Sequence, residues 1–479
     1  MDTVKTVEMM TKDYKYQHIA QNITRLIKTG VLKPGDKLPS IRTICQEQGI
    51  SMNTAKRVYL ELESKALIIS RPQSGYFVAQ VPLRQLPLPA TSHPSGKDSR
   101  PLPVQLVSHV YKDMGKKNLT LFSVGIPAPE LLPVAKLNKC LLKASRELKE
   151  SSVGYESLQG NEKLRRAIAR RSFMWGGSLG PDDIITTSGG MNAISLCMMA
   201  LTKSGDTIAT ESPLYPGILQ LAQSLGLRVL ELPTHPQTGI DLQALKAVVK
   251  EIDLCLLVTN FSTPLGCCMP DENKKAVVKL LEKHHVPLIE DDIYGDLYFG
   301  PSRPISCKSF DKTGNVLWCS SVSKTLAPGY RVGWVSPGRY KEQILRLKHL
   351  HVLSNTAITQ EAVAGFLESG GYDHHLRRLR DILQTNCIHY TNTIASGFPA
   401  GTRISRPQGG LSLWVELQKG TDAAVLYEAA IRQKISIAPG RMFTLQKQFD
   451  NCMRLSLGLP WTEQLQRRLQ QLGRIAGQL

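Results

Sequence analysis

Apolar residues recur with the period of an α-helix in three stretches near the start of the chain, residues 14–30, 40–48 and 51–67. Glycines end the first two stretches, and a serine stands before each of the last two at the position of a helix N-cap. Two short β-rich runs around residues 71–75 then predict a hairpin. Three helices and a hairpin form a winged helix-turn-helix, a compact α+β design that places one helix in a DNA groove.

The pattern changes from about residue 120, where apolar runs alternate with helical stretches. Several runs are continuously apolar, which is typical of strands buried on both faces of a sheet. This alternation predicts an α/β domain with a mainly parallel sheet and flanking helices. After about residue 340, helices followed by short strands predict a smaller α+β C-terminal lobe. The predicted strands of the sheet are residues 183–188, 206–211, 228–232, 254–259, 286–291, 316–321 and 331–335.

A proline-rich stretch without helical or strand periodicity, residues 81–103, separates the two patterns. Proline at this density favours extended backbone without a core, so the stretch predicts an interdomain linker. A short helical run follows it before the body begins. The predicted organisation is a DNA-binding domain at 12–80, a linker at 81–118 and a body at 119–479, whose small lobe starts near 340.

Composition and charge limit the kind of protein. The 479 residues include ten cysteines without the spacing of a disulfide framework. The sequence has no long apolar run and no apolar signal segment at its start, so we expect a cytoplasmic protein with reduced thiols. The net charge is +19, of which the first 120 residues carry +9. This basic end indicates either a polyanion as its partner or a solvated basic surface.

The third predicted helix carries short polar and basic side chains near its start, which are the types that reach base edges and phosphates in DNA. Basic residues of the second helix and of the wing flank it. The alternative is a three-helix domain with a polar surface that binds no DNA. The candidate DNA-binding residues are Arg42, Ser51, Asn53, Thr54, Lys56, Arg57 and Arg71.

Two features of the body suit a phosphate and a protonated ring. Gly189, Gly190 and Met191 follow a predicted strand and open a helix, whose N-terminus favours a phosphate. Asp291 ends another strand, and Tyr294 follows three residues later. A carboxylate there can hold a protonated heterocyclic nitrogen, and a phenol can bond to a nearby oxygen. Taken singly, the glycines can be a glycine-rich turn that binds no ligand, and Asp291 can be an acid that caps the next turn.

One lysine and two arginines complete the set. Lys324 directly follows a predicted strand, and a lysine in a partly enclosed site can lose its proton and form a Schiff base. Arg331, Ser321 and Ser323 suit an anionic phosphate. Arg454, within an apolar strand of the small lobe, needs a carboxylate from a ligand or from a structural acid. Together the features describe a site for pyridoxal 5′-phosphate (PLP).

Two pairs of adjacent histidines, His284–His285 and His374–His375, lie on predicted helices. Neighbours on a helix point about 100° apart, so each pair makes a poor chelate. We therefore predict no metal site there and expect both pairs to face solvent.

The N-terminal part resembles the GntR winged-helix family, on the motifs of residues 30–42, 49–63 and 74–78. Residues 120–479 are similar to the fold-type I aminotransferases, which depend on PLP. A GntR module, a proline-rich linker and an aminotransferase-like body in this order resemble the MocR subfamily of bacterial regulators. The motifs of the body are FSVGIPAPELLP (122–133), YESLQGNEKLR (155–165), TSGGMNA (187–193), ESPLYPG (211–217), NFSTPLG (260–266), EDDIYG (290–295), SVSKTLAPGYRVGW (321–334) and MRLSLG (453–458).

The resemblance implies a role for each of the central residues. Lys324 would form the internal aldimine with PLP, and Asp291 would keep the pyridine nitrogen protonated. Tyr294 would bond to the ring hydroxyl, and Tyr215 would stack on the ring.

The resemblance also implies a second subunit and exposes one departure. Tyr155 would reach the cofactor phosphate of the partner subunit, and Gly125 would lie near the substrate carboxylate. Thr263 occupies the position at which the family has an asparagine that bonds to the cofactor ring oxygen. Either Thr263 donates this bond or Asn260 replaces it. The departure bears on catalytic proficiency more than on cofactor binding, because one hydrogen bond contributes about 0.5–1.5 kcal/mol.

Three functions follow as hypotheses. The first is a homodimeric transcription regulator that reads two DNA half-sites and senses an amino-acid-like or amine effector, through exchange of the Lys324 aldimine. The carboxylate expected on this effector rests on Arg454. The second is an active aminotransferase that uses an amino acid donor and a 2-oxoacid acceptor, which Thr263 argues against. The third is a DNA-binding protein whose body dimerises and holds no cofactor.

Overall fold

The computed structural model describes residues 15–65, 67–71, 74–79, 86–95, 104–116, 118–148 and 153–479. They form two compact units, of which the first holds the residues up to Ala79 and the second most of those from Leu86 on. Residues 81–85 and 96–103 of the predicted linker lie outside the described residues. Among the helices that the structure describes, none combines the length and apolar character that a membrane span needs.

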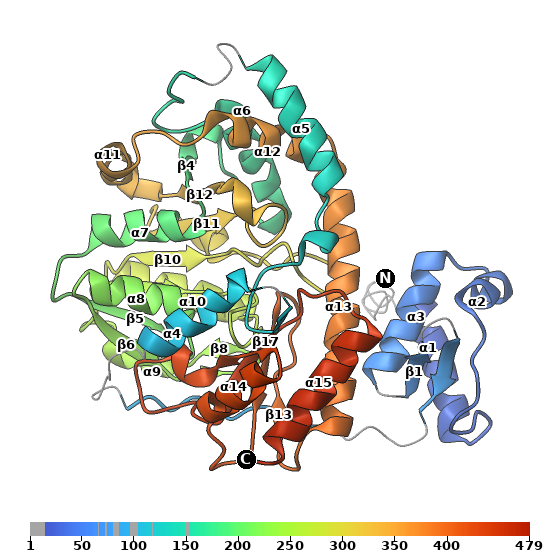
Figure 1. Ribbon diagram of the computed structural model, residues 1–479. Coiled ribbons are helices and arrows are strands. Elements are labelled where there is room, and N and C mark those ends of the chain that lie inside the picture. The colour runs from blue at the N-terminus through green and yellow to red at the C-terminus, as the bar shows by residue number, and fades with distance from the viewer. Residues whose placement is uncertain are drawn as a thin grey trace, which may run out of the picture. The chain divides into compact units, whose positions relative to one another are not determined.

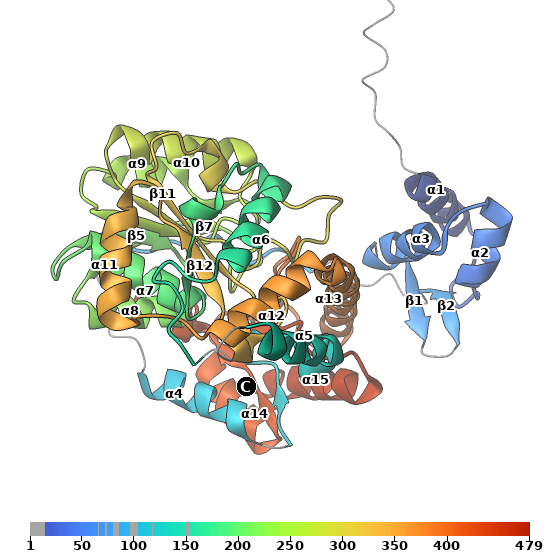
Figure 2. The same ribbon diagram turned by 90° about the horizontal axis from the view of Figure 1, so that it is seen from above.

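The first unit is the predicted winged helix-turn-helix (Figure 2). Ser51 caps the third helix, since its Oγ accepts a hydrogen bond from the backbone N–H of Thr54 at 3.1 Å. Val58, Tyr59 and Leu62 bury the inner face of that helix in the core. The elements of this unit are α1 (Lys15–Lys28), α2 (Ile41–Gln48), α3 (Met52–Ser64) and the antiparallel hairpin of β1 (Ile68–Arg71) and β2 (Gly75–Val78).

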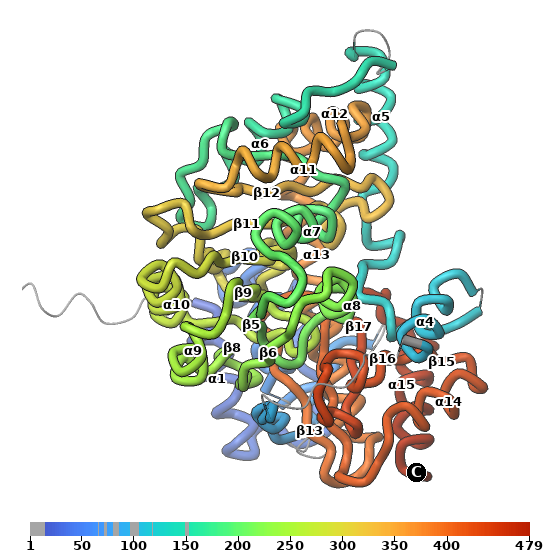
Figure 3. Tube along the Cα trace, turned by 90° about the vertical axis from the view of Figure 1, so that its left-hand side faces the viewer, coloured from blue at the N-terminus to red at the C-terminus, as the bar shows by residue number. Residues whose placement is uncertain are grey.

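The second unit is built on a seven-stranded sheet in the order β4-β12-β11-β10-β9-β5-β6 (Figure 3). Only β12 runs antiparallel to its neighbours β11 and β4, so the predicted mainly parallel sheet is confirmed. The strands are β4 (Ile185–Thr187), β5 (Thr207–Glu211), β6 (Arg228–Leu232), β9 (Leu254–Leu257), β10 (Leu288–Asp291), β11 (Val316–Ser321) and β12 (Gly333–Ser336).

Helices cover both faces of this sheet, with α9 and α10 on one side and α7 and α8 on the other (Figure 2). On the first side, Val277 and Leu281 of α10 pack against Leu257 and Leu288 of the sheet. The helices of the large lobe and of the long return into the small lobe (Figure 1) are α5 (Val134–Glu147), α6 (Glu162–Ser172), α7 (Gly190–Leu201), α8 (Pro216–Ser224), α9 (Leu242–Val248), α10 (Asp271–Lys283), α11 (Lys341–His351), α12 (Ala357–Glu368) and α13 (Gly371–Gly397).

The small lobe has its own antiparallel sheet in the order β13-β14-β17-β16. A separate parallel pair, β3 with β15, ties the start of the body to this lobe. The elements are β3 (Thr120–Leu121), β13 (Arg403–Ile404), β14 (Ser412–Glu416), α14 (Ala423–Arg432), β15 (Ile435–Ser436), β16 (Ala438–Pro439), β17 (Cys452–Ser456) and α15 (Glu463–Ala476), while β7 (Thr234–His235) and β8 (Gly239–Ile240) form a short hairpin in the large lobe.

The stretch before the body is bound to it. Residues 86–95 have neither helix nor strand, but the backbone N–H of Ala90 donates to the Glu416 carboxylate at 2.8 Å. Helix α4 (Val104–Lys112) follows. Just after α4, the buried Asp113 carboxylate accepts hydrogen bonds from Tyr427 Oη at 2.9 Å and Ser436 Oγ at 2.7 Å. These bonds fix α4 against the small lobe.

One expectation about a histidine pair was wrong. His374 is exposed, but His375 is buried and its Nε2 lies 2.7 Å from the backbone oxygen of Thr325. The 100° turn per residue that makes the pair a poor chelate also sends one ring outward and the other inward.

The capping bond of Ser51 gives a first prediction. The Ser51→Ala variant loses the acceptor for an N–H at the start of α3, which costs about 1 kcal/mol of helix stability. We expect the amides of α3 to exchange with deuterium about fivefold faster in the full-length protein, measured by mass spectrometry. Ser64→Ala, at the other end of α3, is the control and should change exchange little. Equal exchange in the two variants would contradict the capping role.

Candidate active site

Lys324 lies just beyond the carboxyl end of β11. Its Nζ donates a hydrogen bond to the backbone oxygen of Gly125 at 2.7 Å and lies 5.8 Å from the centre of the Tyr294 ring. Burial, followed by the positive charge of Arg454, lowers the pKa of this amine to about 8. The amine therefore sheds its proton far more readily than an ordinary lysine, whose pKa is about 10.4.

Asp291 ends the neighbouring strand, β10. Its Oδ1 accepts a hydrogen bond from the backbone N–H of Ile293 at 3.2 Å. Burial raises the pKa of this carboxyl to about 7. A cationic group placed against Asp291 would favour its ionised form, so the site is suited to hold a proton on a ligand. Burial also raises the pKa of the Tyr294 phenol, and a hydrogen bond with Thr263 is among the effects that oppose this rise.

The turn from β4 into α7 forms a cradle for an anion. Gly189 has a φ of +95°, and a Cβ at this position would meet the Arg331 guanidinium at 2.5 Å. Ser321 Oγ accepts the backbone N–H of Ser323 at 3.2 Å, and Ser323 Oγ is buried without a partner among the described residues. A helix N-terminus, an arginine and an unpartnered hydroxyl suit a phosphate.

Arg454 reaches the site from β17 of the small lobe. It is buried, and its Nη2 donates a hydrogen bond to the backbone oxygen of Ser123. No acid of the described residues forms an ion pair with it, and its Nε has no partner there. Burial lowers the pKa of the guanidinium, and the phenols of Tyr294, Tyr111 and Tyr215 oppose this effect. An unpaired buried cation of this kind needs an anion.

Thr263 and Asn260 are the two residues that could take the role of the asparagine that the family has at position 263. Thr263 Oγ1 lies 3.0 Å from Ser412 Oγ, and Thr263 is among the groups that oppose the rise in the pKa of the Tyr294 phenol. The Asn260 amide instead donates to Asp292 at 2.9 Å, and Asn260 is completely buried. Since that amide nitrogen is already engaged, the geometry favours Thr263.

These groups fit PLP. The cofactor offers a carbonyl carbon, a ring nitrogen, a ring oxygen and a phosphate. The chain provides an amine of lowered pKa for the first, Asp291 for the second and the Tyr294–Thr263 pair for the third. The phosphate is left for the unpartnered Ser323 hydroxyl and for Arg331, which bonds to Ser188 just before α7.

The remaining sequence-predicted residues of the body lie at different places. Gly190 and Met191 form the first turn of α7, beside Gly189. Tyr215 precedes α8, and its Oη accepts a hydrogen bond from Tyr111 Oη at 3.0 Å. Tyr155 is 84% exposed, so its side chain does not pack into the core of its own chain.

The candidate DNA-binding residues lie in the first unit. Thr54 Oγ1 lies 2.8 Å from Ser51 Oγ, so both hydroxyls take part in capping α3. The Arg57 guanidinium lies 5.1 Å from the centre of the Tyr16 ring. Arg71 belongs to β1, and its side chain lies outside the described residues. The exposed members are Arg42, Ser51, Asn53, Lys56 and Arg57.

Sequence reasoning missed Tyr111. It lies on α4, in the stretch that the composition assigned to the linker, and its phenol meets Tyr215 within the electrostatic reach of Arg454. Partial burial raises the pKa of this phenol, although Tyr111 is 37% exposed within the described chain. The only signal in the sequence is a tyrosine at the end of a short apolar helical run, which does not reveal a partner more than a hundred residues away.

Comparison with protein families matches both parts of the chain. Residues 15–78 match the family described as bacterial regulatory proteins, gntR family, and residues 118–472 match aminotransferase class I and II. Among solved structures, the multiple substrate aminotransferase of Thermococcus profundus superposes with a TM-score of 0.72 at 23% identity, covering 78% of this chain and 94% of that one. The α-aminoadipate aminotransferase LysN of Thermus thermophilus gives the same TM-score and coverage at 26% identity, and its structure holds N-(5′-phosphopyridoxyl)-L-leucine.

Two relatives match over the whole architecture. The uncharacterized HTH-type transcriptional regulator YjiR of Escherichia coli is 38% identical over 96% of this chain and 98% of its own. The regulator YdcR of the same organism is 36% identical with the same coverage. The chain therefore belongs to the GntR-type transcription regulators that carry an aminotransferase class I and II domain, the architecture of the MocR subfamily.

Proposed function

We propose that this regulator holds PLP covalently on Lys324 and senses an amino-acid-like or amine effector at the same site. One observation carries the proposal: an amine with a pKa of about 8 lies among Asp291, Tyr294 and Arg454, in a body fused to a winged helix. A site with these groups can bind a ligand reversibly, and this binding can change how the fused winged helix binds DNA.

The chain's own residues divide the work of holding the cofactor. When bound, PLP supplies a carbonyl carbon that accepts an amine and a ring that withdraws electrons from it. Lys324 would hold the cofactor through its uncharged amine, and the Asp291 carboxylate would keep a proton at the ring nitrogen. Tyr294 and Thr263 would bond to the ring oxygen, and Arg331 together with the start of α7 would bind the phosphate.

The effector carries a carboxylate. Arg454 is buried without an acid among the described residues, and a ligand carboxylate would satisfy it. Tyr111 and Tyr215 lie near this guanidinium and narrow the class of ligand further, because their rings favour a side chain that tolerates apolar contact. Lys324, whose Nζ donates to the Gly125 carbonyl, is the side chain that an effector amine would replace at the cofactor.

The second candidate is an active aminotransferase with an amino acid donor and a 2-oxoacid acceptor. The presence of Lys324, Asp291 and Arg454 in one site favours it. Thr263 has a shorter reach than the asparagine it replaces, and part of its hydroxyl is engaged with Ser412. A regulator needs only the exchange of Lys324 for an effector amine, whereas an aminotransferase needs repeated turnover. The threonine at position 263 therefore weighs against the enzyme.

The regulator acts as a homodimer. Tyr155 exposes 84% of its surface although the family resemblance gives it a place at the partner's cofactor phosphate, so dimerisation would cover it. Two winged helices would then read two half-sites on DNA. The described cysteines form no disulfide, which suits the reducing conditions of the cytoplasm, where such a regulator meets DNA.

The first test combines a spectrum with DNA binding. The protein with added PLP should show a visible absorbance band that the Lys324→Ala variant lacks, because that variant has no amine for the bond. A genomic DNA fragment selected for binding to the protein should then change its affinity when PLP and an amino acid are added to the parent, measured by fluorescence anisotropy. Lys308→Ala, which changes a lysine outside the site, is the control. A DNA affinity that does not change with PLP or with any amine would contradict the sensing role. Multiple turnovers with a 2-oxoacid would favour the enzyme.

The lowered pKa of Lys324 predicts a pH dependence. Only the uncharged amine attacks, so the rate at which PLP attaches should rise with pH and reach half of its maximum near pH 8. Arg454→Met removes a positive charge that lowers this pKa, so the midpoint should move to higher pH. We would follow the rise of the absorbance band after mixing, with Arg339→Met as a control outside the site. A midpoint that stays in place in Arg454→Met would contradict the assigned electrostatics.

Tyr111 gives a third prediction. Tyr111→Phe removes the hydrogen bond to Tyr215 and keeps the ring, so the PLP band should persist. The affinity for the amino acid that changes the band most should fall about 2–10-fold, since one hydrogen bond contributes about 0.5–1.5 kcal/mol. Titration of the band measures it. Tyr340→Phe, which loses a phenol bond to Asn315 elsewhere, should leave the affinity unchanged. Equal affinities in both variants would show that α4 takes no part in effector binding.

A further inference from the structure

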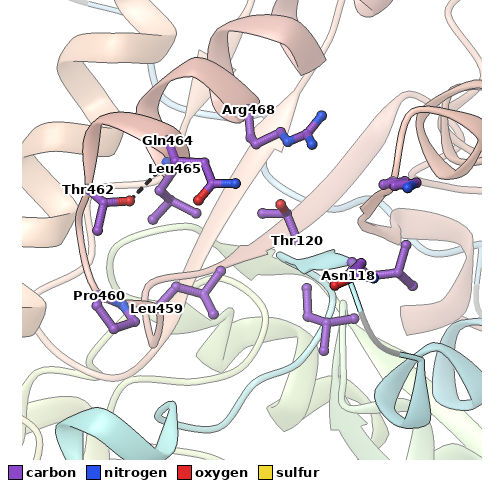
Figure 4. A pocket seen from close by; sticks show the side chains of 11 residues that line it. Asn118, Thr120, Leu459, Pro460, Thr462, Gln464, Leu465 and Arg468 are labelled. Carbon is purple, nitrogen blue, oxygen red and sulfur yellow. Dashed lines mark hydrogen bonds between the residues drawn. The ribbon is translucent and has the colours of Figure 1, made fainter.

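A cavity of about 410 Å³ lies between β3 and the start of α15, apart from Lys324 and the residues around it (Figure 4). Its volume falls within the range of about 300–1,000 Å³ that ligand pockets have. None of the sequence-predicted site residues lines it. The cavity therefore needs an explanation of its own.

The lining of the cavity combines apolar and basic side chains. Leu459 and Pro460 precede α15, Leu465 and Arg468 lie one turn apart on that helix, and Arg468 lies above Thr120 in the view of Figure 4. Lys434 also lines the cavity. Among its described lining residues there is no aspartate or glutamate.

The positive charges are not neutralised within the described part of the chain. Arg468 Nη1 bonds to two neutral oxygens, the Gln433 carbonyl at 3.3 Å and Gln471 Oε1 at 3.1 Å. Neither Arg468 nor Lys434 is among the ion pairs of the described residues. The neighbouring Arg467, in contrast, pairs with Glu463 at 3.5 Å. An anion in the cavity would thus meet two cations that have no competing acid.

We propose that this cavity is a second small-molecule site, which binds an aliphatic carboxylate. The carboxylate lies against Arg468 and Lys434, where charge-assisted hydrogen bonds are strongest. The hydrocarbon chain lies along Leu459 and Leu465 and leaves water on binding. This site goes beyond the proposed function and does not depend on PLP.

The backbone connects this cavity with the PLP site. Thr120 and Leu121 of β3 form part of its wall. Ser123, two residues further, accepts a hydrogen bond from Arg454, and Gly125 accepts one from Lys324. A ligand in the cavity would therefore touch the segment that holds both of these side chains.

Isothermal titration of the full-length protein with hexanoate tests the proposal. Hexanoate carries the carboxylate and an aliphatic chain, hexylamine has the same chain with the opposite charge, and inorganic phosphate is an anion without a chain. We expect saturable binding of hexanoate and at least tenfold weaker binding of the other two. Arg468→Gln and Lys434→Gln should each weaken hexanoate binding at least about tenfold, because they remove charged donors. Arg467→Gln changes the next residue of α15 and should leave the affinity unchanged.

Several results would overturn the proposal. They are the absence of hexanoate binding, equal binding of hexylamine or phosphate, and equal losses in Arg467→Gln and Arg468→Gln. The PLP absorbance band, measured on the same variants, should persist in all three. This keeps the two conclusions apart, since a protein without the band can still bind hexanoate, and a protein with the band can fail to bind it.

Discussion

The position of one amine in a poorly solvated pocket is the constraint on which the active site depends. Lys324 and Arg454 are both cationic side chains taken out of water, and the charge of Arg454 makes it harder for Lys324 to stay charged. Lys324 responds by giving up its proton readily, whereas an arginine stays charged and has to find an anion. The same burial pushes the pKa of Asp291 up to about 7. A carbonyl carbon at Lys324, a ring nitrogen at Asp291 and a carboxylate at Arg454 would relieve all three groups at once.

A network of satisfied hydrogen bonds next to Asp291 stabilises the strand end that carries these poorly solvated groups. Asp292, the next residue, accepts hydrogen bonds from Asn260, Arg303 and Trp318. The carbonyl of Asp292 also accepts the Ser320 hydroxyl at 3.0 Å. These bonds fix the end of β10 and add to the hydrogen bond that the Asp291 carboxylate itself accepts from the backbone N–H of Ile293. Buried polar groups that are fully bonded in this way rigidify the fold around an unsatisfied site.

The sequence was sufficient to place the candidate residues that stand at the ends of strands. Lys324, Asp291 and the Gly189 turn could be predicted because parallel strands present their carboxyl ends at one edge. It was insufficient where a contact joins distant segments, as with Tyr111 and Tyr215 or with Thr263 and Ser412. His375 shows the same limit, because helix periodicity does not say which of two adjacent rings meets the Thr325 carbonyl.

Proline-rich composition predicted a linker, and the structure gives its described parts a further role. Residues 86–95 bond to the body, and α4 carries Tyr111 to the side of Arg454 and Tyr215. Asp113, directly after α4, is tied to the small lobe by two hydrogen bonds. Under the proposed function, the stretch before the body would therefore line the effector site through Tyr111. In the proposed function, a ligand that displaces Tyr111 would act on this stretch directly, and the signal would not need to cross the parallel sheet.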